Sequence, residues 1–285
     1  MQSPSILIGR REATMYEAFY EMQKTPFTRD IPIDQLYESE TIGDALGRLS
    51  YVADRQLFAV VTADSGCGKS TLIRRFVLSL PKEEYLLLYL SDSKLTPRWF
   101  YKGMLDQLGI ESKFYRGDAK RQLQKEIEII RGVHKKKVVC ILDEAHLLEK
   151  ETIEEFRFLL NSHFDSISPM SLILVGQTEL WDKLKLQRYA AVRQRIDINC
   201  VIPRLDRAEC DRYISSHLVY AGGKQEIFTD KAVDDIHKES AGIPRQINRI
   251  CEKCLMYAFQ QGKRLIDEHT VRYVLAHEML GGESS

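Results

Sequence analysis

A short loop of glycine, lysine and hydroxyl side chains is the part of this sequence best suited to bind phosphate. The stretch ADSGCGKST occupies residues 63–71 and directly follows the apolar run at 57–62. In a loop of this type, backbone N–H groups surround phosphate oxygens, the lysine reaches the terminal phosphates, and a hydroxyl holds Mg²⁺. The spacing predicts that ATP and Mg²⁺ bind here, with Ser70 as a metal ligand. The predicted nucleotide-binding residues are Ser65, Gly66, Cys67, Gly68, Lys69, Ser70 and Thr71.

One residue departs from the usual form of this loop, because Ala63 stands where a glycine normally opens the pattern. A methyl group there costs about 1 kcal/mol or slightly more, but only if the residue needs a positive φ. The flanking sequences predict a strand before the loop and a helix after it, and a helix N-terminus attracts anions. We therefore expect a functional loop. Cys67 could be a reactive thiol at that helix end, but we interpret it as a spacer between two glycines.

Two adjacent carboxylates follow the apolar run VVCIL at 138–142. A carboxylate at the end of a strand beside a phosphate-binding loop can hold Mg²⁺ through water, and a second carboxylate can polarise the attacking water. We therefore predict that Asp143 is a metal ligand and Glu144 a catalytic residue. For His146, a local polar contact on the following turn is favoured over a catalytic role.

Gln177 follows the apolar run at 171–176, so it is expected at the same edge of the predicted sheet. Its side-chain amide could orient the attacking water against the γ-phosphate. It could equally cap the helix predicted over TELWDKL. The sequence leaves these two roles open.

Arginines that could reach phosphate occur in two further places. Arg188, Arg193 and Arg195 precede the apolar run at 196–202, and arginine suits bidentate phosphate contacts. In a ring or helical assembly, one of these three could complete the site of a neighbouring subunit, with Arg193 and Arg195 as the predicted catalytic residues. A surface charge cluster explains any single one of them. Arg245 stands one residue inside the helix start predicted in AGIPRQINRI, where it could contact the γ-phosphate.

The composition limits the classes of protein to consider. The 41 basic and 41 acidic side chains cancel, so any nucleic-acid contact must come from local clustering of charge. No apolar run approaches the ~18 residues that span a bilayer, and the start of the sequence lacks the pattern of a signal peptide. We expect a cytoplasmic protein with no membrane contact. Cys251 and Cys254 form a C-x-x-C pair at helical spacing within an apolar stripe, which predicts core packing rather than a metal site.

Five apolar runs alternate with helical segments, which is typical of an α/β fold with a mostly parallel sheet. After Pro203 the strand signal stops, and the remaining sequence predicts helices only. We predict an N-terminal tail, helix and linker at 1–50, an α/β nucleotide-binding domain at 51–205 and a helical lid domain at 206–285. The five predicted strands are 57–62, 85–90, 138–142, 171–176 and 196–202.

Together these motifs resemble those of the AAA+ ATPases, which implies a P-loop AAA+ core and a C-terminal all-helical lid. The opening MYEAFYEMQKTPFTRDIPIDQLYES at 15–39, LVGQTEL and VRQRI look like the ExeA-type subgroup, which merges with transposition-regulator ATPases of the TnsC and MuB kind. The resemblance covers about residues 15–280 and implies a homo-oligomer, either ring or filament. It also implies that Tyr37 contacts the base of the nucleotide.

A basic and aromatic segment at 91–121 is the best candidate for a DNA contact. It carries seven basic and four acidic residues, and clustered lysine and arginine supply the sequence-independent term in DNA binding. In the family that the chain resembles, this segment faces the DNA. The alternative is that the aromatic residues are core and the charges ordinary helix surface. The candidate residues are Lys94, Arg98, Lys102, Arg116, Lys120 and Arg121.

These observations lead to a ranked set of functions. The first is an ATP-dependent switch that oligomerises on duplex DNA without sequence preference and recruits or activates a transposase, with hydrolysis driving disassembly. The alternative is an ExeA-type secretion-assembly ATPase, which is expected to carry a membrane span and a wall-binding domain that this sequence does not show. A scaffold that binds ATP but barely hydrolyses it ranks lower, because both Asp143 and Glu144 are present.

Overall fold

The computed structural model describes residues 15–28, 30–92, 95–159, 168–223 and 226–279, and Lys94 lies outside these ranges. The chain forms two compact units, one of residues 38–203 and one built from residues 1–37 and 204–285. The predicted domain bounds at 50/51 and 205/206 remain predictions. In the contact-based division, Tyr37 is the last N-terminal residue of the helical unit, and Glu38 is the first residue of the α/β unit.

The α/β unit is built on a five-stranded parallel sheet of order β2-β3-β4-β1-β5. Two of its three inner strands, β4 and β1, are buried along their whole length, which explains their nearly continuous apolar sequences. The strands are β1 (Phe58–Ala63), β2 (Tyr85–Leu90), β3 (Lys137–Leu142), β4 (Ser171–Gly176) and β5 (Ile198–Ile202). The predicted α/β fold and its five strands are confirmed.

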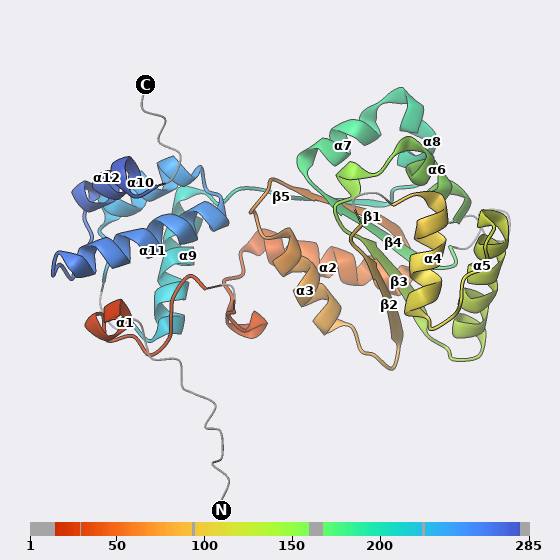
Figure 1. Cartoon of the computed structure of the whole chain (residues 1–285), viewed down its shortest axis with the longest axis horizontal. Helices are drawn as coiled ribbons and strands as arrows, with labels where there is room; N and C mark the ends of the chain where they lie inside the picture. The colour runs from red at the N-terminus through yellow and green to blue at the C-terminus, as the bar shows by residue number, and fades with distance from the viewer. Residues whose placement is uncertain (1–14, 29, 93–94, 160–167, 224–225, 280–285) are drawn as a thin grey trace, which may run out of the picture. The chain divides into compact units, whose positions relative to one another are not determined.

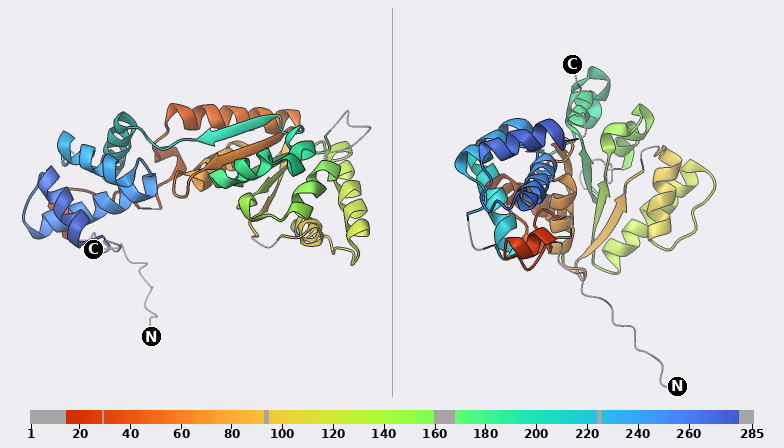
Figure 2. Two further views of the ribbon diagram at one scale, coloured as in Figure 1. Left: turned by 90° about the horizontal axis from the view of Figure 1, so that it is seen from above. Right: turned by 60° about the vertical axis from the view of Figure 1, so that its left-hand side comes forward.

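Helices cover both faces of this sheet (Figure 1). One face carries α2 (Glu40–Arg55) and α3 (Lys69–Ser79), and Figure 2 shows from two further directions that α4 and α5 lie on the other side. On that second face, Phe100, Tyr101 and Phe156 pack into the main core. The helices of the second face are α4 (Pro97–Gln107), α5 (Arg116–Gly132), α6 (Lys150–Leu159), α7 (Thr178–Lys185) and α8 (Ala190–Arg193).

A buried glutamine fastens α2 to the sheet. Gln56 ends α2 in the left-handed conformation, with φ of 56°. Its amide nitrogen donates to the carbonyl of Ala53 at 2.8 Å and to Ser171 Oγ at 3.3 Å, and its oxygen accepts from the backbone of Val138 at 3.2 Å. Because buried polar groups need such partners, Gln56 fixes the end of the helix against β3 and β4.

The second unit contains α-helices with no extended strand among its described residues. The N-terminal segment packs onto it: Tyr20 Oη donates to the carbonyl of Lys263 at 3.0 Å, and the backbone of Gln23 donates to the carbonyl of Ala221 at 2.7 Å. The all-helical C-terminal region is therefore completed by residues from the other end of the chain. The helices are α1 (Met15–Phe19), α9 (Arg207–Ala221), α10 (Asp230–Ser240), α11 (Pro244–Gln260) and α12 (Glu268–His277).

The turn between α10 and α11 needs a glycine. Gly242 has φ of 71°, and a Cβ atom added there would lie 2.1 Å from the carbonyl oxygen of Leu205. The same two residues are hydrogen bonded, since Leu205 N–H donates to the Gly242 carbonyl at 2.9 Å. Any side chain at 242 would push this backbone contact apart. Pro244 then starts α11, as the sequence predicts.

The two cysteines of the C-x-x-C pair are core residues, as predicted. Cys251 and Cys254 are both fully buried free thiols on α11. Burial raises the pKa of Cys254 to about 12 and that of Cys251 well above its usual range. Within the ranges that the structure describes, no three or more Asp, Glu, His or Cys side chains are grouped so that they could hold a metal ion.

None of the helices in the described ranges combines the length and the apolar character that a membrane crossing requires.

Candidate functional site

The loop at 63–71, predicted to bind phosphate, has a backbone shape suited to that role. Gly66 and Gly68 have φ of 86° and 91°, a region that residues with side chains rarely adopt. Gly68 occupies the N-cap position of α3, and no side chain caps this helix end, so its first N–H groups remain available to an anion. Ala63 is the last residue of β1, paired with Ile202. Its conformation is extended, and the methyl group therefore causes no strain.

The side chain of Lys69 is hydrogen bonded to the backbone of its own loop. Its Nζ donates to the carbonyls of Ala63 at 2.9 Å and Asp64 at 3.1 Å. The carboxylate of Asp64 accepts a hydrogen bond from Thr178 Oγ1 at 3.1 Å. Thr178 directly follows Gln177, so this contact ties the loop after β1 to the end of β4.

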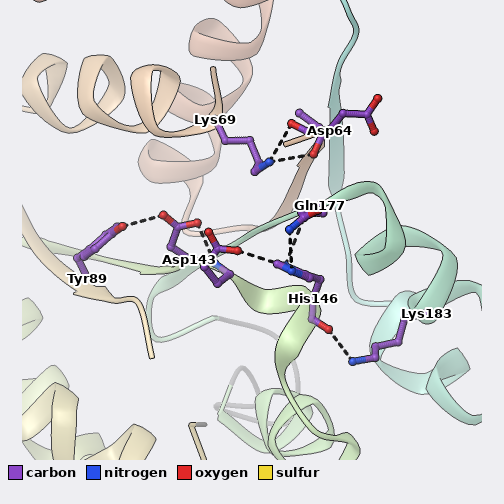
Figure 3. A network of polar contacts seen from close by, with 9 residues as sticks. Asp64, Lys69, Tyr89, Asp143, His146, Gln177 and Lys183 are labelled. Atoms are coloured by element: carbon purple, nitrogen blue, oxygen red, sulfur yellow. Dashed lines mark hydrogen bonds and ion pairs between the residues drawn. The ribbon is translucent and has the colours of Figure 1, made fainter. Parts of the chain in front are cut away.

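The acidic pair lies directly after β3, with each oxygen of Asp143 engaged (Figure 3). Asp143 Oδ1 accepts from the backbone N–H of Glu144 at 2.8 Å, and Oδ2 accepts from Tyr89 Oη at 2.8 Å. Burial and the bond to Asp143 raise the pKa of Tyr89 above its usual range, so the phenol remains a donor. Glu144 has φ of 53°, a costly conformation of the kind that accumulates at functional sites.

Gln177 does not cap its helix. It occupies the N-cap position of α7, but its side chain makes no capping bond; instead Gln177 Nε2 lies 3.1 Å from His146 Nε2. Gly176 permits this approach, since a Cβ atom there would lie 3.1 Å from the backbone nitrogen of His146. His146 Nδ1 lies 3.5 Å from Glu144 Oε2. His146 therefore makes the predicted polar contact, and it joins two strand ends.

Lys69, Glu144 and Gln177 therefore lie along one edge of the sheet. A run of contacts leads from Lys69 through Asp64 to the end of β4, and from Gln177 through His146 to Glu144. The strand order places the loop after β1 and the acidic pair after β3 on either side of β4, and ligands of such sheets bind at the carboxyl ends of the strands. Ser70 and Asp143 offer the oxygen ligands that suit Mg²⁺.

Two predicted residues belong to the helical unit. Tyr37 Oη accepts from Arg212 Nε at 3.4 Å, and its ring lies edge-on to Tyr213. Arg245 is the exposed second residue of α11, so its predicted position inside the helix start is confirmed. The roles of Tyr37 and Arg245 toward a nucleotide remain predictions.

The candidate arginines before β5 have local partners. Arg193 donates to the carbonyls of Leu184 and Lys185, the last two residues of α7. Arg195 donates to the carbonyl of Ala191 at 3.4 Å, and the guanidinium of Arg188 lies over the ring of Tyr189. Arg193 thus satisfies carbonyls that a helix end leaves unpaired. That Arg193 or Arg195 completes the nucleotide site of a neighbouring subunit remains a prediction.

The basic segment divides into paired and unpaired cations. Arg116 bonds to Glu151 at 2.9 Å and Arg121 to Asp118 at 2.5 Å. Lys120 bonds to Glu155, which also accepts from Tyr101. Although burial alone would raise the pKa of Glu155, these two hydrogen bonds lower it. The predicted DNA contacts at these three cations therefore compete with carboxylates of the same unit.

Arg98 and Lys102 differ from these cations, because within the described ranges neither has a carboxylate partner. The guanidinium of Arg98 lies 4.4 Å from the ring centre of Phe114, and Lys102 Nζ lies 4.8 Å from that of Trp99. Both rings are exposed, Trp99 by 52% and Phe114 by 69%. The alternative that the aromatic residues are core holds for Phe100 and Tyr101, which are fully buried.

Several residues of the site were not predicted. Tyr89 is the penultimate residue of β2, the neighbour of β3, and a polar side chain near a strand end was its only signal. Asp64 and Thr178 flank residues that the sequence singled out. Lys183, which donates to the carbonyls of His146 and Leu148 at 2.8 and 2.9 Å, gave no signal.

Comparison with known proteins agrees with this architecture. Residues 52–184 match a family model described as an AAA domain. General secretion pathway protein A of Aeromonas hydrophila is 32% identical over 259 residues, which are 88% of this chain and 46% of that protein. The chain thus spans less than half the length of this relative.

Two solved structures share the fold at low sequence identity. The structure of Drosophila ORC bound to DNA superposes with a TM-score of 0.66 at 16% identity, over 98% of this chain and 70% of that chain. Cdc6p from Pyrobaculum aerophilum gives 0.62 at 14% identity, over 84% and 67%. The fold is therefore that of the P-loop AAA+ proteins, as predicted.

Proposed function

We propose that this chain is an ATP-dependent switch that oligomerises on duplex DNA in the cytoplasm. The observation that carries the proposal is the run of contacts that joins the phosphate-binding loop, the acidic pair and Gln177 at one edge of the sheet. These are the groups needed to bind a nucleoside triphosphate and to activate water. The AAA domain match supports the same activity.

ATP would bind along the loop at 65–71, with its phosphates at the uncapped N-terminus of α3. Lys69 would exchange two carbonyl partners for phosphate oxygens. Ser70 and Asp143 would hold Mg²⁺, which when bound offsets the negative charge of the β- and γ-phosphates. The resemblance to AAA+ proteins adds Tyr37 at the base and Arg245 at the γ-phosphate.

Glu144 would act as the general base of hydrolysis. It takes a proton from water, the water oxygen bonds to the γ-phosphorus, and the bond from that phosphorus to the β,γ-bridging oxygen breaks. ADP leaves with that electron pair. Gln177 orients the water, and Arg193 or Arg195 of a neighbouring subunit stabilises the developing charge. Arg193 would have to leave the carbonyls at the end of α7 to do so.

The DNA contact is proposed for Arg98 and Lys102, with Lys94 as a sequence-based addition. Cations without a carboxylate partner bind phosphate at a lower cost than cations that must first break an ion pair. Reversing the charge of Arg98 and Lys102 together should weaken duplex binding and flatten its salt dependence. Reversal at Arg116 and Arg121 changes the net charge of the same segment equally and serves as the matched control. Equal losses of DNA affinity in both variants would show that Arg98 and Lys102 contribute no more to DNA binding than Arg116 and Arg121.

The central experiment measures ATP turnover with and without duplex DNA, together with electron microscopy for rings or filaments. The proposal expects turnover, DNA-dependent assembly, and a Glu144→Gln variant that binds ATP, turns over at least about 100-fold more slowly and stays assembled. Turnover by Glu144→Gln at the unaltered rate would exclude Glu144 as the base. No assembly on DNA under ATP would exclude the DNA switch.

The partner is proposed as a transposase, on the resemblance to transposition regulators alone. The structural similarity to ORC, whose structure was solved bound to DNA, supports only the DNA part of this proposal. The second candidate is a secretion-assembly ATPase, and the similarity to general secretion pathway protein A favours it. If neither ATP turnover nor assembly changes when DNA is added, this second candidate is favoured.

A further inference from the structure

His146 lies between the two side chains proposed to handle the attacking water (Figure 3). Its Nδ1 is 3.5 Å from Glu144 Oε2, and its Nε2 is 3.1 Å from Gln177 Nε2. The His146 side chain is only 11% exposed, against 46% for Glu144. A nearly buried ring thus makes one contact with each partner.

The protein holds this ring in place from its backbone. Lys183 donates to the carbonyls of His146 and Leu148, which fixes the 3-10 turn at Ala145–Leu147. Gly176 lets the same turn approach β4 closely. The backbone that carries the imidazole is therefore held by contacts other than the two that the ring makes with Glu144 and Gln177.

The two contacts between Gln177 and the ring require different positions of the ring proton. The side-chain amide nitrogen of Gln177, 3.1 Å away, makes His146 Nε2 the acceptor and leaves the proton on Nδ1. The backbone N–H of Gln177, 3.5 Å away, would instead make Nδ1 the acceptor. The Glu144 carboxylate lies 3.5 Å from the same Nδ1. We adopt the form with the proton on Nδ1, because it bonds to a charged acceptor, which is the stronger bond.

We propose that His146 is a positioning residue that orients Glu144 and Gln177 together, so that each presents a hydrogen-bond acceptor to the attacking water. The proposal rests on the hydrolysis proposed above. His146 binds one carboxylate oxygen of Glu144, which leaves Oε1 for the water. It also binds the amide nitrogen of Gln177, which turns Oε1 of that amide outward. Water has two protons, and the pair supplies two acceptors, which is how proximity and orientation lower a barrier.

A spectroscopic test needs no turnover. Imidazole nitrogen spectra of the ¹⁵N-labelled full chain, with His146 assigned by comparison with His146→Gln, should show a protonated Nδ1 and an unprotonated Nε2. Gln177→Leu should shift the His146 Nε2 signal and leave that of His217 unchanged. A proton on Nε2, or a signal that ignores Gln177→Leu, would overturn the proposal.

A kinetic test separates the two contacts. Asparagine places a polar atom near Nδ1, so His146→Asn keeps the contact with Glu144, whereas glutamine reaches the position of Nε2, so His146→Gln keeps the contact with Gln177. Each variant should lose about 10-fold in kcat with little change in KM, the loss expected from one hydrogen bond. His146→Ala should lose more, and adding Gln177→Ala to it should cost little further. Unchanged kcat in all variants would overturn the proposal.

Lys183→Met is the structural control, because it loosens the same turn without removing the imidazole. It should lower the melting temperature and reduce kcat less than His146→Asn does. If it reproduces the kcat losses of the His146 variants, His146 acts only through the fold of the turn and the proposal is wrong. Absence of turnover in the unaltered chain would instead count against the proposed function, and the nitrogen spectra would still decide the contacts of His146.

Discussion

The two units of this chain surround a largely covered histidine in opposite ways. In the α/β unit, His146 has a polar partner at each ring nitrogen. In the helical unit, His217 is 3% exposed, its ring stacks on Phe27, and neither of its nitrogens has a hydrogen-bond partner among the described residues. The first environment gives each ring nitrogen a polar neighbour. The second buries both nitrogens without one, which costs stability.

The largest expected effect is the loss of nucleotide binding in Lys69→Ala. Lys69 is the cation of the loop, and its ammonium group has no substitute there, so affinity for ATP should fall by about 1,000-fold. Titration with a fluorescent ATP analogue measures this loss. The helical unit should keep its stability, because its core does not include the loop. Tight ATP binding by the variant would show that this loop does not bind the phosphates of ATP.

The helical unit should break first at its turn glycine. Gly242→Ala places a methyl group against the Leu205 carbonyl and should lower the free energy of unfolding by more than about 3 kcal/mol. Denaturant titration followed by circular dichroism measures this loss. Gly68→Ala is the contrasting variant, since nothing lies within 4 Å of the added Cβ and only the φ of 91° opposes it. A greater loss of stability in Gly68→Ala would contradict the comparison.

Acid should selectively weaken the helical unit. Burial lowers the pKa of His217 to about 4, against about 6.5 in an unfolded chain. Between these two pKa values, His217 binds a proton in the unfolded state but not in the folded state. The free energy of unfolding therefore falls as the pH drops from about 6.5 to about 4. The total loss is up to about 3 kcal/mol. Unfolding titrations across this range measure it.

The control for this acid effect is His217→Leu, which removes the titrating group and keeps an apolar side chain. Its stability should change less between pH 6.5 and 4 than that of the unaltered chain. Parallel pH profiles of the two proteins would show that His217 does not titrate as its burial requires.

The smallest expected effect is that of Ala63→Gly, which restores the usual loop pattern. Because Ala63 is extended at the end of β1, glycine offers no relief of strain. Glycine in a strand should lower the free energy of unfolding by about 0.5–1 kcal/mol. ATP affinity should change by less than about threefold. A gain of 10-fold or more in the titration would show that the methyl group obstructs the loop.

The sheet was predictable from the sequence because buried parallel strands are continuous apolar runs. The positions of Lys69, Asp143 and Gln177 followed from the ends of those runs. The placement of the N-terminal segment did not follow, because Gln23 bonds to the end of α9 and Phe19 lies against Phe259 of α11, more than 190 residues further along the sequence. No local pattern records such a pairing.

The contacts within the site were harder to predict than its members. That His146 reaches Gln177 depends on the neighbouring positions of β3 and β4 and on a close approach at Gly176. The ion pairs of Arg116 and Lys120 depend on the packing of α5 beside α6. Sequence composition identifies the charges of this segment but not which of them are already paired.

The discontinuous helical unit has a consequence for synthesis on the ribosome. Residues 15–37 emerge before the α/β unit, whereas α9 and α11, which share a core with Phe19, Tyr20 and Phe27, emerge after it. The α/β unit is continuous in sequence and can fold as soon as residue 203 is available. During that interval the early aromatic side chains have no native partner, so this protein should depend on chaperones or rapid elongation more than its modest size would imply.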